Sequence, residues 1–245
     1  MKAKFSLAVL CLLLRGAPVL VRAEPIVVAG ITEPIYDVTL SASVPGIVSA
    51  WIFKEGDFVK KGETIIELDK KLEELEAERR KLAMDNRKQD RDNLQALYKK
   101  SSISVKKDEL EKVETEYKIA AVEYEMAVEQ LRKRSITTPC SGNITDITRD
   151  VGEACQPYQP LIRVVDTRQC YFISNVEARA AGRLKLDQNI KVEIEISPAP
   201  AKIQGKIVFL SPVVDPASGL QKVRVLFDNT DGRVRPGVAG KLIIE

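Results

Sequence analysis

The chain has 245 residues, 44% of them hydrophobic and 30% charged, which suits one or two modest globular cores beside a strongly solvated segment. It contains no histidine and only three methionines, which argues against histidine-based acid catalysis, a serine–histidine triad and a metal-handling site. Its formal charge is +3 at pH 7.

Residues 1–23 have the pattern of a secretory signal peptide. Lys2 and Lys4 form a basic start, an apolar run covers residues 5–14, and residues 21–23 resemble a small-residue cleavage site. We therefore expect a periplasmic protein that is secreted through a cleaved signal peptide.

Two other interpretations of this segment are weaker. An uncleaved anchor needs about 20 apolar residues to cross a bilayer, and this run is interrupted by Arg15. Cys11 follows a leucine, whereas a lipoprotein site carries a small residue there. Cleavage also removes four positive charges from a total of +3 and leaves −1, so we expect no nucleic-acid partner.

Two stretches of the chain repeat one pattern of glycines between short apolar runs. The first is VPGIVSAWIFKEGDFVKKGETIIELD, residues 44–69, and the second is TPCSGNITDITRDVGEACQPYQPLIRVVD, residues 138–166. At a constant offset of 96 the matched pairs are Gly46 and Gly142, Val48 and Ile144, Gly56 and Gly152, Ile65 and Leu161, Ile66 and Ile162, and Leu68 and Val164. Neither half has enough apolar surface to be stable alone, so we expect both to form one β-domain.

The residues between the two halves predict a pair of long helices. Residues 70–134 contain no glycine and no proline and are rich in Glu, Lys, Arg, Leu and Ala. Asp69 is a candidate N-cap for the first helix. The serine-rich stretch 99–104 predicts a turn, with Ser104 as a candidate cap of the second helix. Arms of about 30 residues, each roughly 45 Å long, would then form an antiparallel hairpin.

Apolar spacing predicts which helix faces meet. Steps of three and four give a heptad seam on the second helix, formed by Leu110, Val113, Tyr117, Ala120, Tyr124, Ala127 and Leu131. The corresponding series on the first helix begins apolar and becomes polar, with Leu72, Leu75, Arg79, Leu82, Asn86, Gln89, Asn93 and Ala96.

From residue 171 the chain alternates short apolar runs with Pro- or Gly-containing breaks. KVEIEI, KIQGKIVFL, KVRVLF and GKLIIE are typical of an antiparallel sheet or a small barrel, and a short helix at 178–186 is expected to plug one end. The sequence thus predicts a mainly β protein with a long α-helical coiled-coil hairpin. Its parts are a signal peptide at 1–23, a split β-domain at 24–69 and 135–169, the hairpin at 70–134 and an antiparallel β-barrel at 170–245.

The split β-domain resembles lipoyl and biotinyl carrier domains, the barrel-sandwich hybrid fold. Those domains display a modified lysine on a tight hairpin between their halves, and the same junction holds Asp69 and Lys70 here. A carrier lysine would lie on a helix in this chain. The alternative is that Asp69 caps the helix and Lys70 is solvated, so we expect no cofactor.

Three cysteines follow the predicted signal peptide. We interpret Cys140, Cys155 and Cys170 as small buried apolar residues, and Cys155 matches Val59 of the first half, while a disulfide between Cys140 and Cys155 stays open as a second interpretation. No CxxC, HExxH, GxSxG or P-loop pattern occurs, so no catalytic or metal-binding residue is predicted.

The order of these parts resembles the periplasmic adaptor, or membrane fusion, subunits of tripartite efflux and secretion systems, in a compact form. The resemblance covers nearly the whole mature chain and rests on the two half-motifs, the hairpin between them, and a barrel with GKIVFLSPVVDPASG and DNTDGRVRPG. It implies a lipoyl-like domain, a hairpin that reaches an outer-membrane channel, and a barrel that contacts an inner-membrane transporter and neighbouring adaptors in a ring.

The resemblance also suggests where the channel would bind. Members that dock trimeric channels often carry an Arg, a Leu four residues later and a Ser seven residues beyond that. Leu97 and Ser104 match, whereas Asn93 stands at the arginine position, with Arg91 two residues away. The expected partner-binding residues at the hairpin tip are Leu97, Lys100, Ser101, Ser102 and Ser104.

The function expected from the resemblance is non-catalytic and positional. The chain would link an inner-membrane efflux transporter to an outer-membrane channel as a homo-oligomer. Two alternatives are a lipoyl- or biotin-type carrier and a coiled-coil scaffold of the envelope without a pump.

Overall fold

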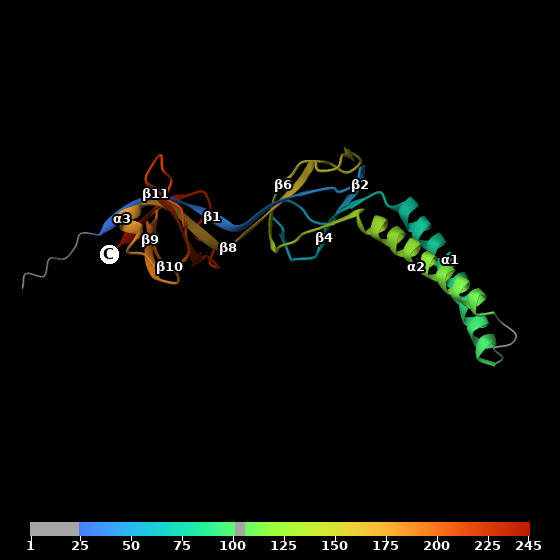
Figure 1. Cartoon of the computed structure of the whole chain (residues 1–245). Helices are drawn as coiled ribbons and strands as arrows, with labels where there is room; N and C mark the ends of the chain where they lie inside the picture. The colour runs from blue at the N-terminus through green and yellow to red at the C-terminus, as the bar shows by residue number, and fades with distance from the viewer. Residues whose placement is uncertain (1–24, 101–105) are drawn as a thin grey trace, which may run out of the picture.

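The computed structural model describes residues 25–100 and 106–245. Three bodies follow one another (Figure 1): a closed β-barrel, a β-sandwich, and a pair of long helices at the far end. The predicted signal peptide at 1–23 lies outside the described residues. Within the described ranges, no helix is both long enough and apolar enough to cross a membrane.

Six antiparallel strands close the barrel. Its two longest strands, β1 (Ile26–Ser41) and β8 (Pro160–Glu177), pair with each other and complete the ring. The strands between them are, in sheet order from β1, β12 (Ala239–Ile244), β9 (Asn189–Ile194), β10 (Ala201–Leu210) and β11 (Leu220–Asp228). Phe172, Val225 and Leu242 are fully buried among the residues that fill it. The prediction of a small antiparallel barrel is therefore confirmed.

The helix expected at 178–186 is much shorter. Helix α3 covers only Ala178–Ala181, and the chain then turns through Gly182. Three residues of this region, Ala180, Ala181 and Leu184, still belong to the barrel core, so the segment covers apolar surface with one helical turn.

The boundary between the barrel and the sandwich differs from the expected one. The sequence predicts that residues 24–69 belong to the split β-domain, but Ile26–Ile31 pair with β12 in the barrel. Strand β1 then passes a register shift between Pro34 and Tyr36 and enters the sandwich. A continuous strand carries no sequence signal for which sheet it joins, and the six-stranded ring closes only because β1 pairs on both sides.

The sandwich consists of two four-stranded layers. One layer contains the second half of β1, the first half of β8, β6 (Gly142–Ile147) and β3 (Phe58–Val59). The other follows the order β5 (Ser135–Thr137), β4 (Thr64–Leu68), β2 (Gly46–Trp51) and β7 (Ala154–Cys155). One apolar core joins the two layers, with Ile65, Ile66, Leu68, Leu161, Ile162 and Val164 all buried in it.

The repeat read from the sequence is visible in the hydrogen bonds. The N–H of Gly56 donates to the carbonyl of Ile144 at 2.8 Å, and the N–H of Gly152 donates to the carbonyl of Val48 at 2.8 Å. Each residue of the second bond lies 96 positions from its counterpart in the first. The two halves therefore exchange equivalent contacts across an approximate two-fold relation, and they fold as one body.

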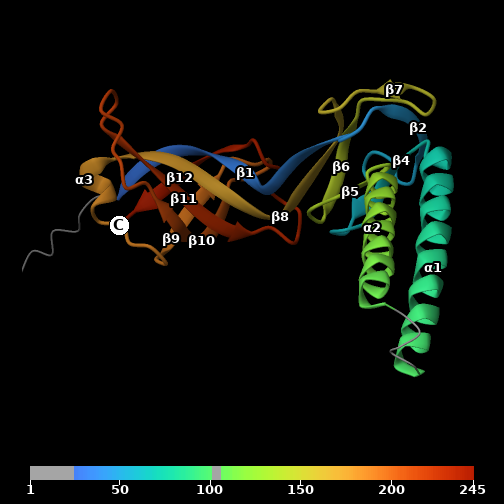
Figure 2. The ribbon, with the colours of Figure 1, turned by 45° about the vertical axis from the view of Figure 1, so that its right-hand side comes forward.

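Two long helices pack side by side in both ribbon views (Figures 1 and 2). They are α1 (Lys71–Lys100) and α2 (Lys107–Arg132). On α2, Ala120 and Ala127 are buried, as the predicted seam requires.

The series predicted for α1 is wrong. Leu72 and Leu82 are 77% and 61% exposed, and Leu75 is exposed as well. The face that meets α2 contains Ala77, which is buried, and half-buried residues at three- and four-residue spacing, namely Arg80, Met84, Arg91, Leu94 and Tyr98.

Three arginines of α1 also contact α2 along this face. Arg80 pairs with Glu123 at 2.5 Å and Arg87 pairs with Glu116 at 3.2 Å. Arg91 lies over the ring of Tyr117, with 4.1 Å between its guanidinium carbon and the ring centre. An arginine covers apolar surface with its stem while its head group pairs with a charge or a ring, so these three residues contribute to the contact between the helices.

Candidate functional site

The end of the hairpin farthest from the sandwich carries the predicted partner-binding residues. Leu97 and Lys100 lie in the last turns of α1, and Leu97 is 54% exposed. Ser101, Ser102 and Ser104 lie outside the described residues. Helix α2 begins at Lys107, and Lys106 at its N-cap makes no side-chain capping hydrogen bond.

Arg91, the arginine nearest to the expected tip pattern, faces inward. Its guanidinium stacks on Tyr117 and donates to a carboxylate oxygen of Asp92 at 2.6 Å, and these contacts raise its pKa, chiefly through the bond to Asp92. It is therefore engaged between the helices. Asn93, which stands at the pattern's arginine position, is exposed.

Each helix also carries an exposed apolar stripe away from its partner. On α1 the stripe consists of Leu72, Leu75 and Leu82, and on α2 of Ile119, Val122 and Met126, all of them exposed. The spacing of three, four or seven residues puts the members of each stripe on one side of their helix. The sequence predicts that the α1 leucines form the contact with α2, whereas in the structure they are exposed.

The root of the hairpin joins both helices to the sandwich. Arg134 donates to Glu73 at 2.5 Å and to the carbonyl of Pro45 at 2.9 Å. Lys70 pairs with Glu67 at 2.8 Å, so its ammonium is held against strand β4. A carrier lysine on a hairpin tip would instead be free in solution.

Asp69 precedes the helix start by one residue more than expected. Its carboxylate accepts from the N–H of Lys71 at 3.3 Å, while the carbonyl of Lys70 accepts the first helical bond, from Glu74 at 2.9 Å. Lys70 therefore takes the N-cap position that the sequence predicts for Asp69.

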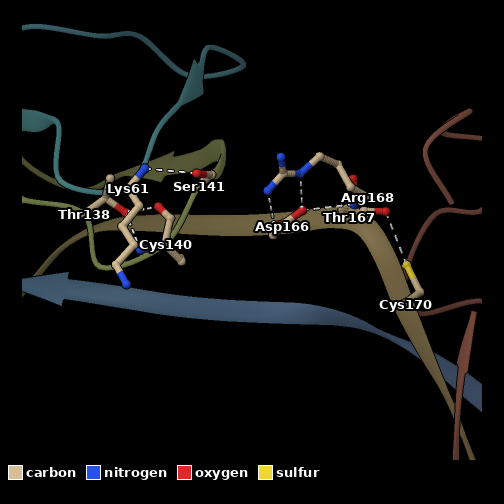
Figure 3. A network of polar contacts seen from close by, with 8 residues as sticks. All are labelled: Lys61, Thr138, Cys140, Ser141, Asp166, Thr167, Arg168 and Cys170. Atoms are coloured by element: carbon tan, nitrogen blue, oxygen red, sulfur yellow. Dashed lines mark hydrogen bonds and ion pairs between the residues drawn. The ribbon is translucent and has the colours of Figure 1, made fainter. Parts of the chain in front are cut away.

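A second polar cluster lies where β8 passes from the sandwich to the barrel (Figure 3). The carboxylate of Asp166 is buried and accepts three bonds from Arg168: from its backbone N–H at 3.0 Å, from Nε at 3.0 Å and from Nη2 at 2.7 Å. These side-chain bonds hold the pKa of Asp166 below its usual range. The guanidinium carbon of Arg168 also lies 5.2 Å from the ring centre of Phe58. The backbone carbonyl of Arg168 accepts a hydrogen bond from the backbone N–H of Asn229 in the barrel.

The three cysteines are buried free thiols. Cys140, Cys155 and Cys170 make no disulfide, which favours the apolar interpretation. Burial raises the pKa of the Cys170 thiol to about 11. Among the residues that the structure describes, no group of histidine, cysteine or acidic side chains has the arrangement of a metal site.

Two family models match the chain. A model described as "RND MFP, barrel-sandwich hybrid domain" covers residues 36–167, and one described as "CusB-like, beta-barrel domain" covers residues 173–245. A curated relative, an uncharacterized protein of Haemophilus influenzae, is 22% identical over 203 residues, which cover 83% of this chain. This chain spans 52% of the length of that relative.

Several solved structures share the fold. A MacA–MexA chimeric protein that contains the Pseudomonas aeruginosa MexA α-hairpin domain has a TM-score of 0.78 at 20% identity, covering 91% of this chain and 79% of its own. MacA from Actinobacillus actinomycetemcomitans has a TM-score of 0.69 at 20% identity with the same coverage, 91% and 79%. ZneB from Cupriavidus metallidurans has a TM-score of 0.56 at 22% identity, covering 90% and 71%. The first family model alone covers more than half of the sequence, and the chain therefore belongs to the RND membrane fusion protein family.

Proposed function

We propose that this protein is a non-catalytic periplasmic adaptor that connects an inner-membrane efflux transporter to an outer-membrane channel. The observation that carries the proposal is the helix pair, which extends away from the sandwich (Figure 2). Leu97, near the far end of this pair, is exposed. The barrel lies at the opposite end of the molecule from the helices (Figure 1), so the protein has two separated ends, as a connector between two partners requires.

In this proposal the hairpin end binds the channel and the barrel end faces the transporter. Leu97 and Lys100, together with Ser101, Ser102 and Ser104, form the channel-binding set. Family membership and the exposed position of Leu97 support this assignment. No bond is made or broken, and the work of the protein is to hold its partners at a fixed separation.

Self-association into a ring belongs to the same proposal. Exposed apolar stripes on both helices are expensive to leave in water and are typical of surfaces that pack against another protein. A second copy of the hairpin offers the same stripes together with many charged side chains, so neighbouring hairpins can cover each other laterally.

Crosslinking in the native cells tests the proposal. A photoreactive amino acid at Leu97, or single cysteines at Ser101 or Ser102, should capture an outer-membrane channel protein. The same probe at Lys60, which lies in the sandwich, should capture none. If the tip probes capture no channel while the protein is produced normally, the scaffold alternative is favoured.

The carrier alternative has its own test. An intact mass equal to that of the mature polypeptide is expected. An added mass that maps to Lys70 and corresponds to a lipoyl or biotinyl group would favour the carrier, against the ion pair that Lys70 forms with Glu67.

A further inference from the structure

The two helices are connected to the sandwich by very short joints. Strand β4 ends at Leu68 and α1 begins at Lys71, while α2 ends at Arg132 and β5 begins at Ser135. Two residues lie between strand and helix at each joint, 69–70 and 133–134, and each of these residues has two rotatable backbone torsions. The covalent joints alone therefore leave the direction of the hairpin open.

Arg134 bridges the parts that meet at this root. Its guanidinium donates to Glu73 in the first turn of α1 at 2.5 Å and to the carbonyl of Pro45 in the β1–β2 loop at 2.9 Å. Its own backbone N–H donates to Leu131 at the end of α2, and its carbonyl accepts from Leu68 at the end of β4. One residue thus contacts both helices and two separate segments of the sandwich.

We propose that Arg134 is a positioning residue that fixes the angle at which the hairpin leaves the sandwich. The Arg134 and Glu73 side chains are 21% and 20% exposed, so water screens their interaction less than that of the surface pairs. A guanidinium presents its donors in a rigid planar fork, which holds two acceptors in a defined geometry. Glu73 and Pro45 are 28 positions apart in the chain, so this geometry ties α1 to the loop.

Gly46 provides the space for this contact. A Cβ atom at Gly46 would lie 2.8 Å from Nη1 of Arg134, closer than real side chains approach. The matched glycine of the second half, Gly142, has a different neighbour, because a Cβ there would lie 2.6 Å from the carbonyl oxygen of Val165. The repeat has a glycine at both positions. Only the space beside Gly46 is filled by an arginine side chain from the root of the hairpin, that of Arg134.

A neighbouring ion pair offers a matched control. Arg132 pairs with Glu129 at 2.9 Å, but both residues belong to α2 and their side chains are 68% and 56% exposed. This pair cannot set the direction of the hairpin, because it connects no two parts of the molecule. Arg132→Gln removes the same charge two residues from Arg134.

Distances between two spin labels test the proposal. Cysteines introduced at Lys60 in the sandwich and Lys88 on α1 are both exposed, whereas the three native cysteines of the described chain are buried. Pulsed electron spin resonance on the full mature chain should give one narrow distance distribution. Arg134→Gln and Glu73→Gln should each broaden or shift it, the double variant should do so no more than either single variant, and Arg132→Gln should leave it unchanged.

Two outcomes would overturn the proposal. An unchanged distribution in Glu73→Gln would show that the joints fix the hairpin without the ion pair, and this variant stays informative even if Arg134→Gln fails to fold. If Arg132→Gln broadened the distance distribution as much as Arg134→Gln does, the effect would come from the loss of a positive charge near the helix end and not from the contacts of Arg134. That a fixed hairpin angle serves to reach a channel rests on the proposed function. The spin-label distances are measured on the isolated chain, so they test the role of Arg134 independently of whether the protein is an adaptor.

Discussion

Gly62 and Tyr158 occupy equivalent corners of the two halves of the sandwich, 96 positions apart. Both have a left-handed backbone, with φ of 87° and 65°. The N–H of Gly62 donates to the carbonyl of Thr138, and the N–H of Tyr158 donates to that of Ala42. The acceptors are also 96 positions apart, so one turn is built twice, once with glycine and once with tyrosine.

The tyrosine turn should be strained. A left-handed backbone costs a residue with a Cβ atom about 1–2 kcal/mol, and Tyr158 is 87% exposed, so its ring gains little from packing in the chain itself. We expect Tyr158→Gly to raise the free energy of unfolding by up to about 1 kcal/mol, Gly62→Ala to lower it by about 1 kcal/mol, and Tyr158→Ala to change it little. Urea unfolding checks this. A loss of stability in Tyr158→Gly would show that the ring, not the backbone, matters.

The first residues of β1 should be needed to close the barrel. A chain that starts at Tyr36 lacks the residues that pair with β12, and this leaves open edges on β8 and β12. Open edges promote aggregation. We expect lower thermal stability and higher-order species in size-exclusion chromatography. A chain that lacks only residues 1–23 serves as the control, and equal behaviour of the two would contradict the closure of the ring by β1.

The Asp166–Arg168 pair should make stability depend on pH. Because its folded-state pKa lies below the ordinary value of 3.8, Asp166 contributes stability above that value, and the contribution is lost as pH falls through the lowered pKa. Asp166→Asn should cost about 2 kcal/mol at pH 7, and the difference from the wild type should close at lower pH.

Asp231 provides the control for this pH dependence. It pairs with Arg233 at the same spacing of two residues but is exposed, so Asp231→Asn should have a small effect at every pH. Thermal unfolding between pH 7 and pH 3 gives both curves. If the difference in stability between Asp166→Asn and the wild type stayed constant with falling pH, this would argue against the ion pair.

The buried thiols should be unreactive in the native state. The thiolate is the reactive form, and both burial and a pKa of about 11 disfavour it at Cys170. We expect Cys140, Cys155 and Cys170 to react with a thiol reagent at pH 8 only after unfolding, with Cys11 absent from the mature chain. Isolation of the native protein with a Cys140–Cys155 disulfide would contradict the free thiols.

A charge in the exposed stripe of α1 should weaken self-association. Leu82→Glu puts a carboxylate on the surface that we expect a neighbouring hairpin to cover, where an unpaired charge is costly. Lys81→Glu introduces the same residue one position earlier, about 100° around the helix. Analytical ultracentrifugation should show loss of oligomers for Leu82→Glu at concentrations where Lys81→Glu still assembles. Equal assembly of both variants would exclude this stripe from the contact.

The repeat could be read from the sequence because its signal is local. Gly56, Gly62 and Gly152 supply the left-handed backbone of the tight turns, and Ile65 with its match Leu161 fills the shared core. Each half therefore specifies its own strands. The same matched apolar residues also predict the contact between the halves, because the apolar face of each half is buried against that of the other.

The α1 contact could not be read in this way. Leucines at regular spacing predict a buried stripe, but the face of α1 that meets α2 also carries Arg80 and Arg87, whose acidic partners lie on α2. Whether an arginine lies in a seam or in water depends on an acid across the interface. A single helix does not contain that information.

The order of the parts follows from the amino-acid sequence alone: a glycine-marked half, a helical insertion, a second half, and a run of alternating strands. These follow from periodicity and turn residues, which act over a few positions. Long-range packing sets where β1 changes from barrel to sandwich, which side of α1 meets α2, and how Arg134 joins Glu73 across 61 positions. These contacts depend on distant segments meeting in space, and neither propensity nor spacing encodes which distant partner each side chain will find.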